Sequence, residues 1–180
     1  MNRLIILVVL CVAIVAFVGW HFIGSRLYSE LVVPWLFKKR VVKGLGSETI
    51  QTLIDYPRDS PAVGSPYRTG KLLLVKFDQE GEIHFVRWGF LDSELAFTPE
   101  DIGTVVFIIV HHTPITCYDG GSKAYETTTT GTIVDWRKQL TVGRKAFTKR
   151  PPKKSKGRGD KYALVAYGEV QDWIRGLECK

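Results

Sequence analysis

Residues 4–25 read LIILVVLCVAIVAFVGWHFIGS, and these 22 positions contain no Asp, Glu, Lys or Arg. Leu, Ile, Val or Phe occupies 14 of the first 20, which covers every face of a helix. An α-helix rises about 1.5 Å per residue, so about 20 apolar residues cross a hydrocarbon core of about 30 Å. At roughly −0.3 to −0.6 kcal/mol each, these side chains favour insertion by about 4–8 kcal/mol. The segment therefore predicts a transmembrane helix.

Two alternatives exist for this segment. A cleavable signal peptide would use Arg3 as its n-region and cut after a small residue such as Ala16 or Ser25. The apolar part is longer than the roughly 7–15 residues that signal peptides use, which favours a retained anchor. A buried helix of a soluble core is the other alternative, but uniformly apolar core helices are rarely this long or this close to a chain terminus. We expect residues 1–30 to be a single-pass anchor and its juxtamembrane end.

Residues 31–46 follow as a basic, membrane-proximal linker in this interpretation. Trp35 and the cations of residues 38–43 suit the headgroup level, where Trp is enriched and Lys and Arg meet anionic phosphates. Residues 31–37 suit the first packed segment of the following domain equally well. Positive charge flanking a membrane helix favours the cytoplasm, and here most of it follows the helix, so we expect a cytoplasmic domain. A short basic N-terminus that stays inside favours the opposite orientation.

Residues 47–180 have the size and the pattern of one β-rich domain. The turn Asp78-Gln-Glu-Gly81 predicts a hairpin, and the apolar run 104–110 predicts a buried central strand. Short helices are expected at 48–56, capped by Ser47, and at 168–177. The predicted strands cover residues 71–77, 82–88, 103–111, 115–118, 123–130, 132–138 and 140–148. This pattern favours a mainly antiparallel sheet, barrel or sandwich with short flanking helices, although an α+β fold is also compatible with it.

Positive charge is concentrated in two short segments. The whole chain has a net charge of +7, of which residues 149–161 contribute +6 and residues 38–43 contribute +4, leaving −3 elsewhere. Such clustering favours local contact with an anionic surface. Pro and Gly, together with charge repulsion, predict that residues 149–161 form an extended loop. The candidate anion-binding residues are Lys38, Lys39, Arg40, Lys43, Lys149, Arg150, Lys153, Lys154, Lys156, Arg158 and Lys161.

The expected partners are the lipid bilayer and, through these cations, anionic lipid headgroups or an acidic protein. Each Lys or Arg near an anionic membrane contributes roughly 1 kcal/mol. Nucleic acid is disfavoured because the basic loop lacks the interleaved aromatic residues on which single-stranded bases stack. A solvated loop that only improves solubility is the plain alternative.

Catalytic signatures are absent from the sequence. There is no G-x-S-x-G motif, and no Cys-x-x-Cys spacing. His84, His111 and Cys117 are weak candidates for a metal site, while His111 and His112 should point to opposite faces of a strand. Cys117 and a neighbouring histidine are the residue types that a nucleophilic site needs. They lie close together in the sequence on one strand end, however, which disfavours their convergence on a substrate. We expect no cofactor.

These observations favour a membrane-anchored binding or assembly module over an enzyme. The alternatives are a membrane-tethered hydrolase or metal-dependent enzyme, and an accessory subunit whose anchor packs on a larger membrane complex. The sequence leaves open whether Cys117 and Cys179 pair, and it leaves the oligomeric state undefined.

Overall fold

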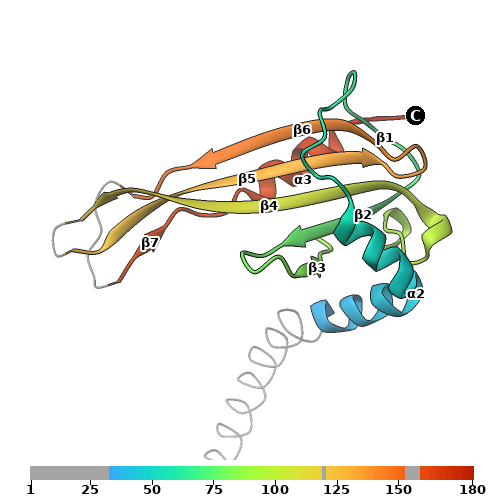
Figure 1. Cartoon of the computed structure of the whole chain (residues 1–180), viewed down its shortest axis with the longest axis horizontal. Helices are drawn as coiled ribbons and strands as arrows, with labels where there is room; N and C mark the ends of the chain where they lie inside the picture. The colour runs from blue at the N-terminus through green and yellow to red at the C-terminus, as the bar shows by residue number, and fades with distance from the viewer. Residues whose placement is uncertain (1–32, 119–120, 153–158) are drawn as a thin grey trace, which may run out of the picture.

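The computed structural model describes residues 33–118, 121–152 and 159–180 (Figure 1). The expected anchor, residues 4–25, therefore lies outside the described residues. Within them, no helix combines the length and the apolar character that crossing a bilayer needs. The described part is mainly β, with one large sheet, one small sheet and two helices. Its strands form an open sheet, so the barrel alternative does not apply to this part of the chain.

The elements are as follows. The helices are α2 (Val33–Asp55) and α3 (Tyr167–Arg175), and the 3-10 turns are η2 (Asp92–Glu94) and η3 (Pro99–Asp101). The strands are β1 (Tyr67–Arg68), β2 (Lys71–Phe77), β3 (Ile83–Phe85), β4 (Ile102–Cys117), β5 (Lys123–Asp135), β6 (Leu140–Lys149), β7 (Lys161–Tyr162) and β8 (Glu178–Cys179).

The large sheet has the order β3-β2-β4-β5-β6, and β7 adds to β5. Three neighbouring pairs in it are antiparallel, namely β2–β3, β4–β5 and β5–β6. The other two pairs are parallel: β2 with β4, where Val75 lies opposite Phe107, and β5 with β7. The sheet is therefore mainly antiparallel, as expected, but it also contains two parallel pairs that the sequence did not predict. The chain between β2 and β4 contains β3, η2 and η3. It returns to the end of the sheet where β2 begins, so that β4 can run parallel to β2.

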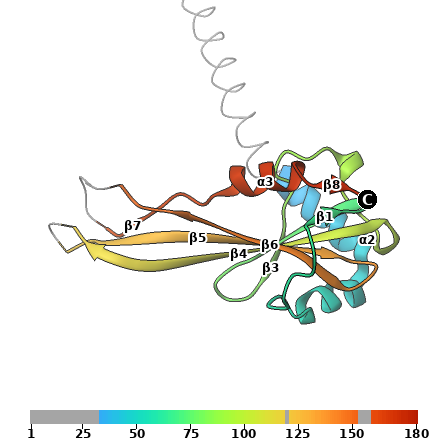
Figure 2. The same ribbon diagram turned by 90° about the horizontal axis from the view of Figure 1, so that it is seen from above.

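The β4–β5 hairpin projects from the body as a long arm (Figures 1 and 2). Pairing between β2 and β4 ends at Phe77 opposite Ile109, so the rest of β4 has β5 as its only strand neighbour among the described residues. Along β5, pairing with β6 ends at Thr127 opposite Lys149, and β7 then pairs with Ala124 and Tyr125. The arm therefore carries the two ends of the basic loop.

The second half of α2 and helix α3 lie on opposite faces of the sheet (Figure 2). After α2, Tyr56 stacks on Phe107 of β4 with ring centroids 5.4 Å apart. On the other face, Trp173 of α3 packs against Phe147 at 6.0 Å. Gly131 of β5 makes room for this helix, because a Cβ there would lie 2.9 Å from the Trp173 ring. Strand alternation thus buries the centre of the sheet on both faces.

Residues 33–46 are helical and packed, which corrects the expectation of a linker. Pro34 suits the first turn of a helix because its missing N–H has no partner there in any case. Phe37, Val41 and Leu45 recur at i, i+4 and i+8 and enter the same core as the sheet. The helix bends at Gly46, whose φ of +74° favours glycine. Phe37 therefore belongs to a packed segment of the domain, which is the alternative given above for residues 31–37.

Candidate anion-binding surfaces

The first half of α2 presents different chemistry on its two sides. Its inner side carries Phe37, Val41 and Leu45, all buried. Its outer side carries Trp35, Lys39 and Val42, spaced i, i+4 and i+7, and all three are exposed. The Lys39 ammonium lies 5.1 Å from the Trp35 ring centroid, within the range of a cation–π interaction.

Arg40 differs from the other three cations of this segment, because it binds the protein itself. Its guanidinium donates to Asp92 at 3.0 Å and lies 3.8 Å from the Phe97 ring centroid. Lys38, Lys39 and Lys43 are exposed, and no carboxylate of the described residues forms an ion pair with them. Three of the four predicted cations are therefore available to an external anion.

Ion pairs neutralise some of the cations at the described ends of the basic loop. Lys149 forms an ion pair with Glu169, and Arg150 forms one with Glu126 at 3.3 Å. Lys161 belongs to β7 and is half-buried against the arm. The four remaining predicted cations lie outside the described residues: Lys153, Lys154, Lys156 and Arg158.

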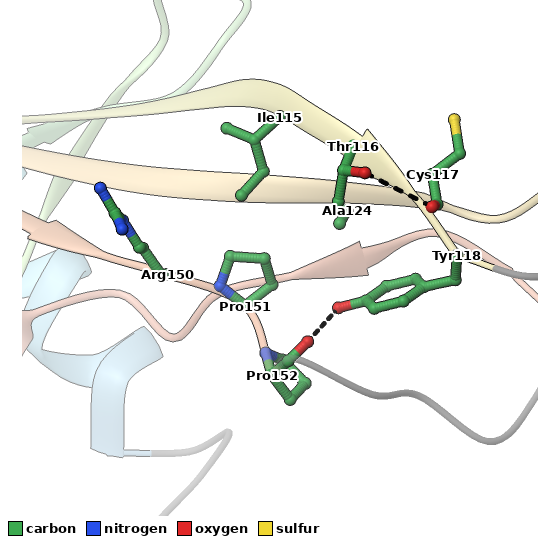
Figure 3. A pocket seen from close by; sticks show the side chains of 8 residues that line it. All are labelled: Ile115, Thr116, Cys117, Tyr118, Ala124, Arg150, Pro151 and Pro152. Carbon is green, nitrogen blue, oxygen red and sulfur yellow. Dashed lines mark hydrogen bonds between the residues drawn. The ribbon is translucent and has the colours of Figure 1, made fainter.

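The ends of the loop are also held in place by hydrogen bonds. The Tyr118 hydroxyl donates to the carbonyl of Pro152 at 2.5 Å. The Asp160 carboxylate accepts the Lys123 backbone N–H at 2.9 Å. Between the hairpin end and residues 150–152 lies a recess of about 480 Å³, lined by Ile115, Thr116, Cys117, Tyr118, Ala124, Arg150, Pro151 and Pro152 (Figure 3). The described ends of the basic loop, residues 150–152 and 159–161, thus lie beside the β4–β5 hairpin.

His84, His111 and Cys117 are not brought together. His84 lies on β3, whereas His111 and Cys117 lie on β4, and no described group of three metal-ligand types contains His111 or Cys117. His111 faces a shallow hollow that it shares with Arg58 and Arg144. On the opposite face, His112 Nδ1 donates to Thr127 Oγ1 at 2.9 Å. The alternation expected for His111 and His112 is therefore found.

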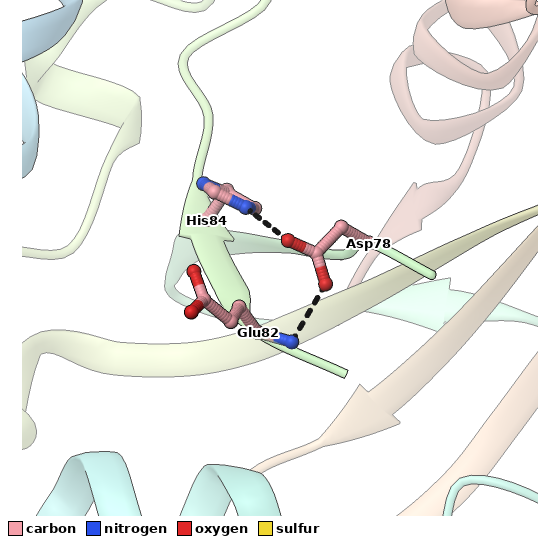
Figure 4. A group of neighbouring side chains, drawn as sticks. All are labelled: Asp78, Glu82 and His84. Atoms are coloured by element: carbon pink, nitrogen blue, oxygen red, sulfur yellow. Dashed lines mark hydrogen bonds and ion pairs between the residues drawn. The ribbon is translucent and has the colours of Figure 1, made fainter. Parts of the chain in front are cut away.

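A different group meets at the β2–β3 turn. Donor atoms of Asp78, Glu82 and His84 lie within 4.8 Å of one another (Figure 4). Asp78 accepts the backbone N–H of Glu82 at 2.7 Å and Nε2–H of His84 at 2.8 Å, so both of its oxygens already close the hairpin. Sequence reasoning identified the turn and missed this group. The sequence did contain a signal for the group: Asp78, Glu82 and His84 stand at i, i+4 and i+6, and the predicted hairpin brings such positions together.

Local contacts set the protonation of the groups near these surfaces. The hydrogen bond from His84 holds the pKa of Asp78 below its ordinary value. The hydrogen bond from Lys149 likewise holds the pKa of Glu169 below its ordinary value. Burial raises the pKa of Tyr125, and the nearby Asp160 raises it further. The shifts in the pKa values of Asp78, Glu169 and Tyr125 are therefore all directed away from neutral pH.

Cys117 and Cys179 are both free and exposed. Cys117 ends β4 in the arm, whereas Cys179 pairs through β8 with β1 beside the C-terminus, at the other end of the described structure (Figure 1). The two thiols therefore do not form a disulfide within one molecule.

No known protein family, curated protein or solved structure matches this chain.

Proposed function

We propose that this chain is a single-pass membrane-anchored binding or assembly module, without catalytic activity, that engages anionic lipid headgroups or an acidic partner. The observation that carries the proposal is the distribution of unpaired lysines. Lys38, Lys39 and Lys43 have no acidic partner among the described residues, whereas Arg40, Lys149 and Arg150 do. The apolar residues 4–25 supply the anchor, and the charge after them favours a cytoplasmic domain.

The arm supports the same proposal from the other end of the molecule. It carries the ends of a loop with net charge +6 away from the body (Figures 1 and 2). Hydrogen bonds to Tyr118 and Lys123 hold the described ends of the loop in place, so those end residues need no further ordering when an anion binds. Less ordering means a smaller entropic cost of binding.

The test uses the full chain in nanodiscs of neutral lipid, mixed with separate anionic vesicles. Replacing Lys153, Lys154 and Lys156 by Gln removes roughly 3 kcal/mol of electrostatic attraction, or about 100-fold in affinity. Co-flotation across a salt series measures this loss, and wild-type binding should weaken steeply as salt screens the charges. An acidic polypeptide in place of the vesicles distinguishes the two anion classes.

A charge-matched variant controls for net charge. Arg137, Lys145 and Lys180 are exposed cations that lie outside the loop, and none of them forms an ion pair among the described residues. Replacing these three by Gln should change binding by less than about threefold, because more distant exposed charges are screened beyond about 8 Å. Binding that resists salt, or that both variants reduce equally, would contradict the proposal.

A metal-dependent enzyme is the second candidate, and the Asp78, Glu82 and His84 group is the observation that favours it. Two carboxylates and an imidazole are a donor set that Zn²⁺ accepts. Because Asp78 already uses both oxygens in the hairpin, we expect purified full-length protein to contain well below one zinc ion per chain. Elemental analysis measures this directly. Stoichiometric zinc that His84→Ala removes would instead favour the enzyme.

A further inference from the structure

The outer face of the first half of α2 has an unusual composition for a surface in water. Trp35, Leu36 and Val42 are 57%, 46% and 40% exposed, and Lys39 and Lys43 lie among them. No acidic residue occurs between Glu30 and Glu48. Aromatic and aliphatic side chains interleaved with lysines are typical of helices that lie in a membrane interface.

This face cannot turn inward to bury its apolar side chains. The opposite side is fixed by Phe37, whose ring meets Phe97 edge-on at 5.8 Å, and by the ion pair between Arg40 and Asp92. Gly44 completes the contact, since a Cβ there would fall onto the Phe97 carbonyl. Trp35 therefore faces outward for as long as the domain is folded. Figure 1 shows this half of α2 (blue) along the outer side of the body.

The chemistry of the helix changes at the bend. Beyond Gly46 the exposed residues include Glu48, Gln51 and Asp55, with Gln51 hydrogen-bonded to Asp55 at 3.0 Å. Those residues suit water, and their negative charge would be repelled by anionic lipid. The basic, apolar surface thus ends where the helix changes direction.

The chain also limits how far this face lies from the bilayer. Ten residue steps separate Ile23, in the apolar segment, from Val33 at the start of α2. Even fully extended, such a connection spans at most about 35 Å. Tethering at this range gives a high effective concentration, so a modest affinity for lipid is sufficient.

We infer that residues 33–45 lie along the surface of the anionic membrane that holds the anchor. Trp35, Leu36 and Val42 sit at the boundary between headgroups and acyl chains, and Lys39 and Lys43 contact lipid phosphates. This rests on the anchoring part of the proposed function and adds the orientation of the domain against the bilayer. A second copy of the chain fits the face less well, because it would bring lysines against lysines.

The test measures the depth of single nitroxide labels on the full chain in nanodiscs that contain anionic lipid. Cys11, Cys117 and Cys179 are first replaced by Ala or Ser, and Leu36→Cys and Val42→Cys then carry the label. Gln51→Cys, exposed on the same helix beyond the bend, is the matched control. Accessibility to oxygen rises in lipid and accessibility to a nickel chelate rises in water.

We expect the oxygen-to-nickel accessibility ratio at positions 36 and 42 to exceed that at 51 at least threefold. Lys39→Glu with Lys43→Glu should remove most of this difference while the melting temperature stays close to that of the wild type. Equal ratios at all three positions overturn the inference, and so does dipolar broadening that indicates a second copy on this face.

Failure of this inference is distinguishable from failure of the proposed function. A chain that stays in the nanodisc and binds separate anionic vesicles through its loop, but shows water-exposed labels at 36 and 42, overturns only the position of α2. A chain that does not enter the nanodisc overturns the anchor and this inference together.

Discussion

Gly44→Ala should lower the free energy of unfolding by about 2–3 kcal/mol, which is the upper part of the range for overpacked sites. An added Cβ would lie 1.8 Å from the carbonyl oxygen of Phe97. The neighbour is backbone rather than the end of a flexible side chain, so either α2 or the segment before η3 has to move. The intrinsic preference of Ala for helices, about 1 kcal/mol over Gly, offsets only part of this cost.

Thermal and urea denaturation of the full chain in nanodiscs measure the loss, and hydrogen exchange at Phe37, Val41 and Leu45 locates it. Gly168→Ala is the control, because Gly168 in the first turn of α3 has nothing within 4 Å of the added Cβ. That variant should be as stable as the wild type or slightly more stable. A Gly44→Ala chain with wild-type stability and exchange would show that α2 does not pack against Phe97.

The parts of the fold that local residues determine were predicted well. Gly81 has a φ of +85° and donates its N–H to Asp78 at 3.3 Å, which is the turn that the spacing of these two residues predicted. The helix predicted at 168–177 is α3, with Val170 and Ile174 buried as expected. Both features depend on residues close in sequence, so the pattern alone contains the information.

The errors came from interactions between distant residues. Gly131 separates two predicted strands, but β5 runs through it, because the space left by its missing side chain is filled by Trp173 from α3. Likewise, Pro114 lies within β4 and did not end it. Beyond Ile109 this strand has only β5 beside it in the described part, and a proline is tolerated where one edge has no partner.

The same limit applies to the candidate surfaces. The sequence located the positive charge, yet it did not show which cations have partners. Arg40 pairs with Asp92, 52 positions away, and Lys149 pairs with Glu169, 20 positions away. Pairings at such separations depend on the tertiary fold, which is why the predicted set of cations contains both available and neutralised members.

Asp135→Ala should lower the free energy of unfolding by about 2–3 kcal/mol at neutral pH, within the range for hydrogen bonds to a buried charge. The Asp135 side chain is 2% exposed at the end of β5. It accepts the Tyr67 hydroxyl at 2.8 Å and forms an ion pair with Lys138 at 3.1 Å. The substitution leaves the Tyr67 hydroxyl and the Lys138 backbone N–H without this acceptor.

The difference between wild type and variant should also depend on pH. Burial acts to raise the pKa of Asp135, but the hydrogen bonds from Tyr67 and Lys138 outweigh it, so the folded pKa lies below the ordinary value of 3.8. The unfolded chain therefore takes up a proton more readily than the folded one. The stabilisation is fully present above this ordinary value and is lost as pH falls through the folded pKa.

Urea denaturation between pH 7 and pH 2.5 measures both effects. The stability gap between wild type and Asp135→Ala should stay constant down to about pH 5 and shrink in more acidic solution. Asp78 and Glu169 also have lowered pKa values, but they titrate in both chains and cancel in the difference. Tyr67→Phe, which removes one donor and keeps the carboxylate, should cost about 1–2 kcal/mol. A gap that is absent at pH 7, or that widens in acid, would contradict the role given to Asp135, because its hydrogen bonds would then not outweigh the effect of burial on its pKa.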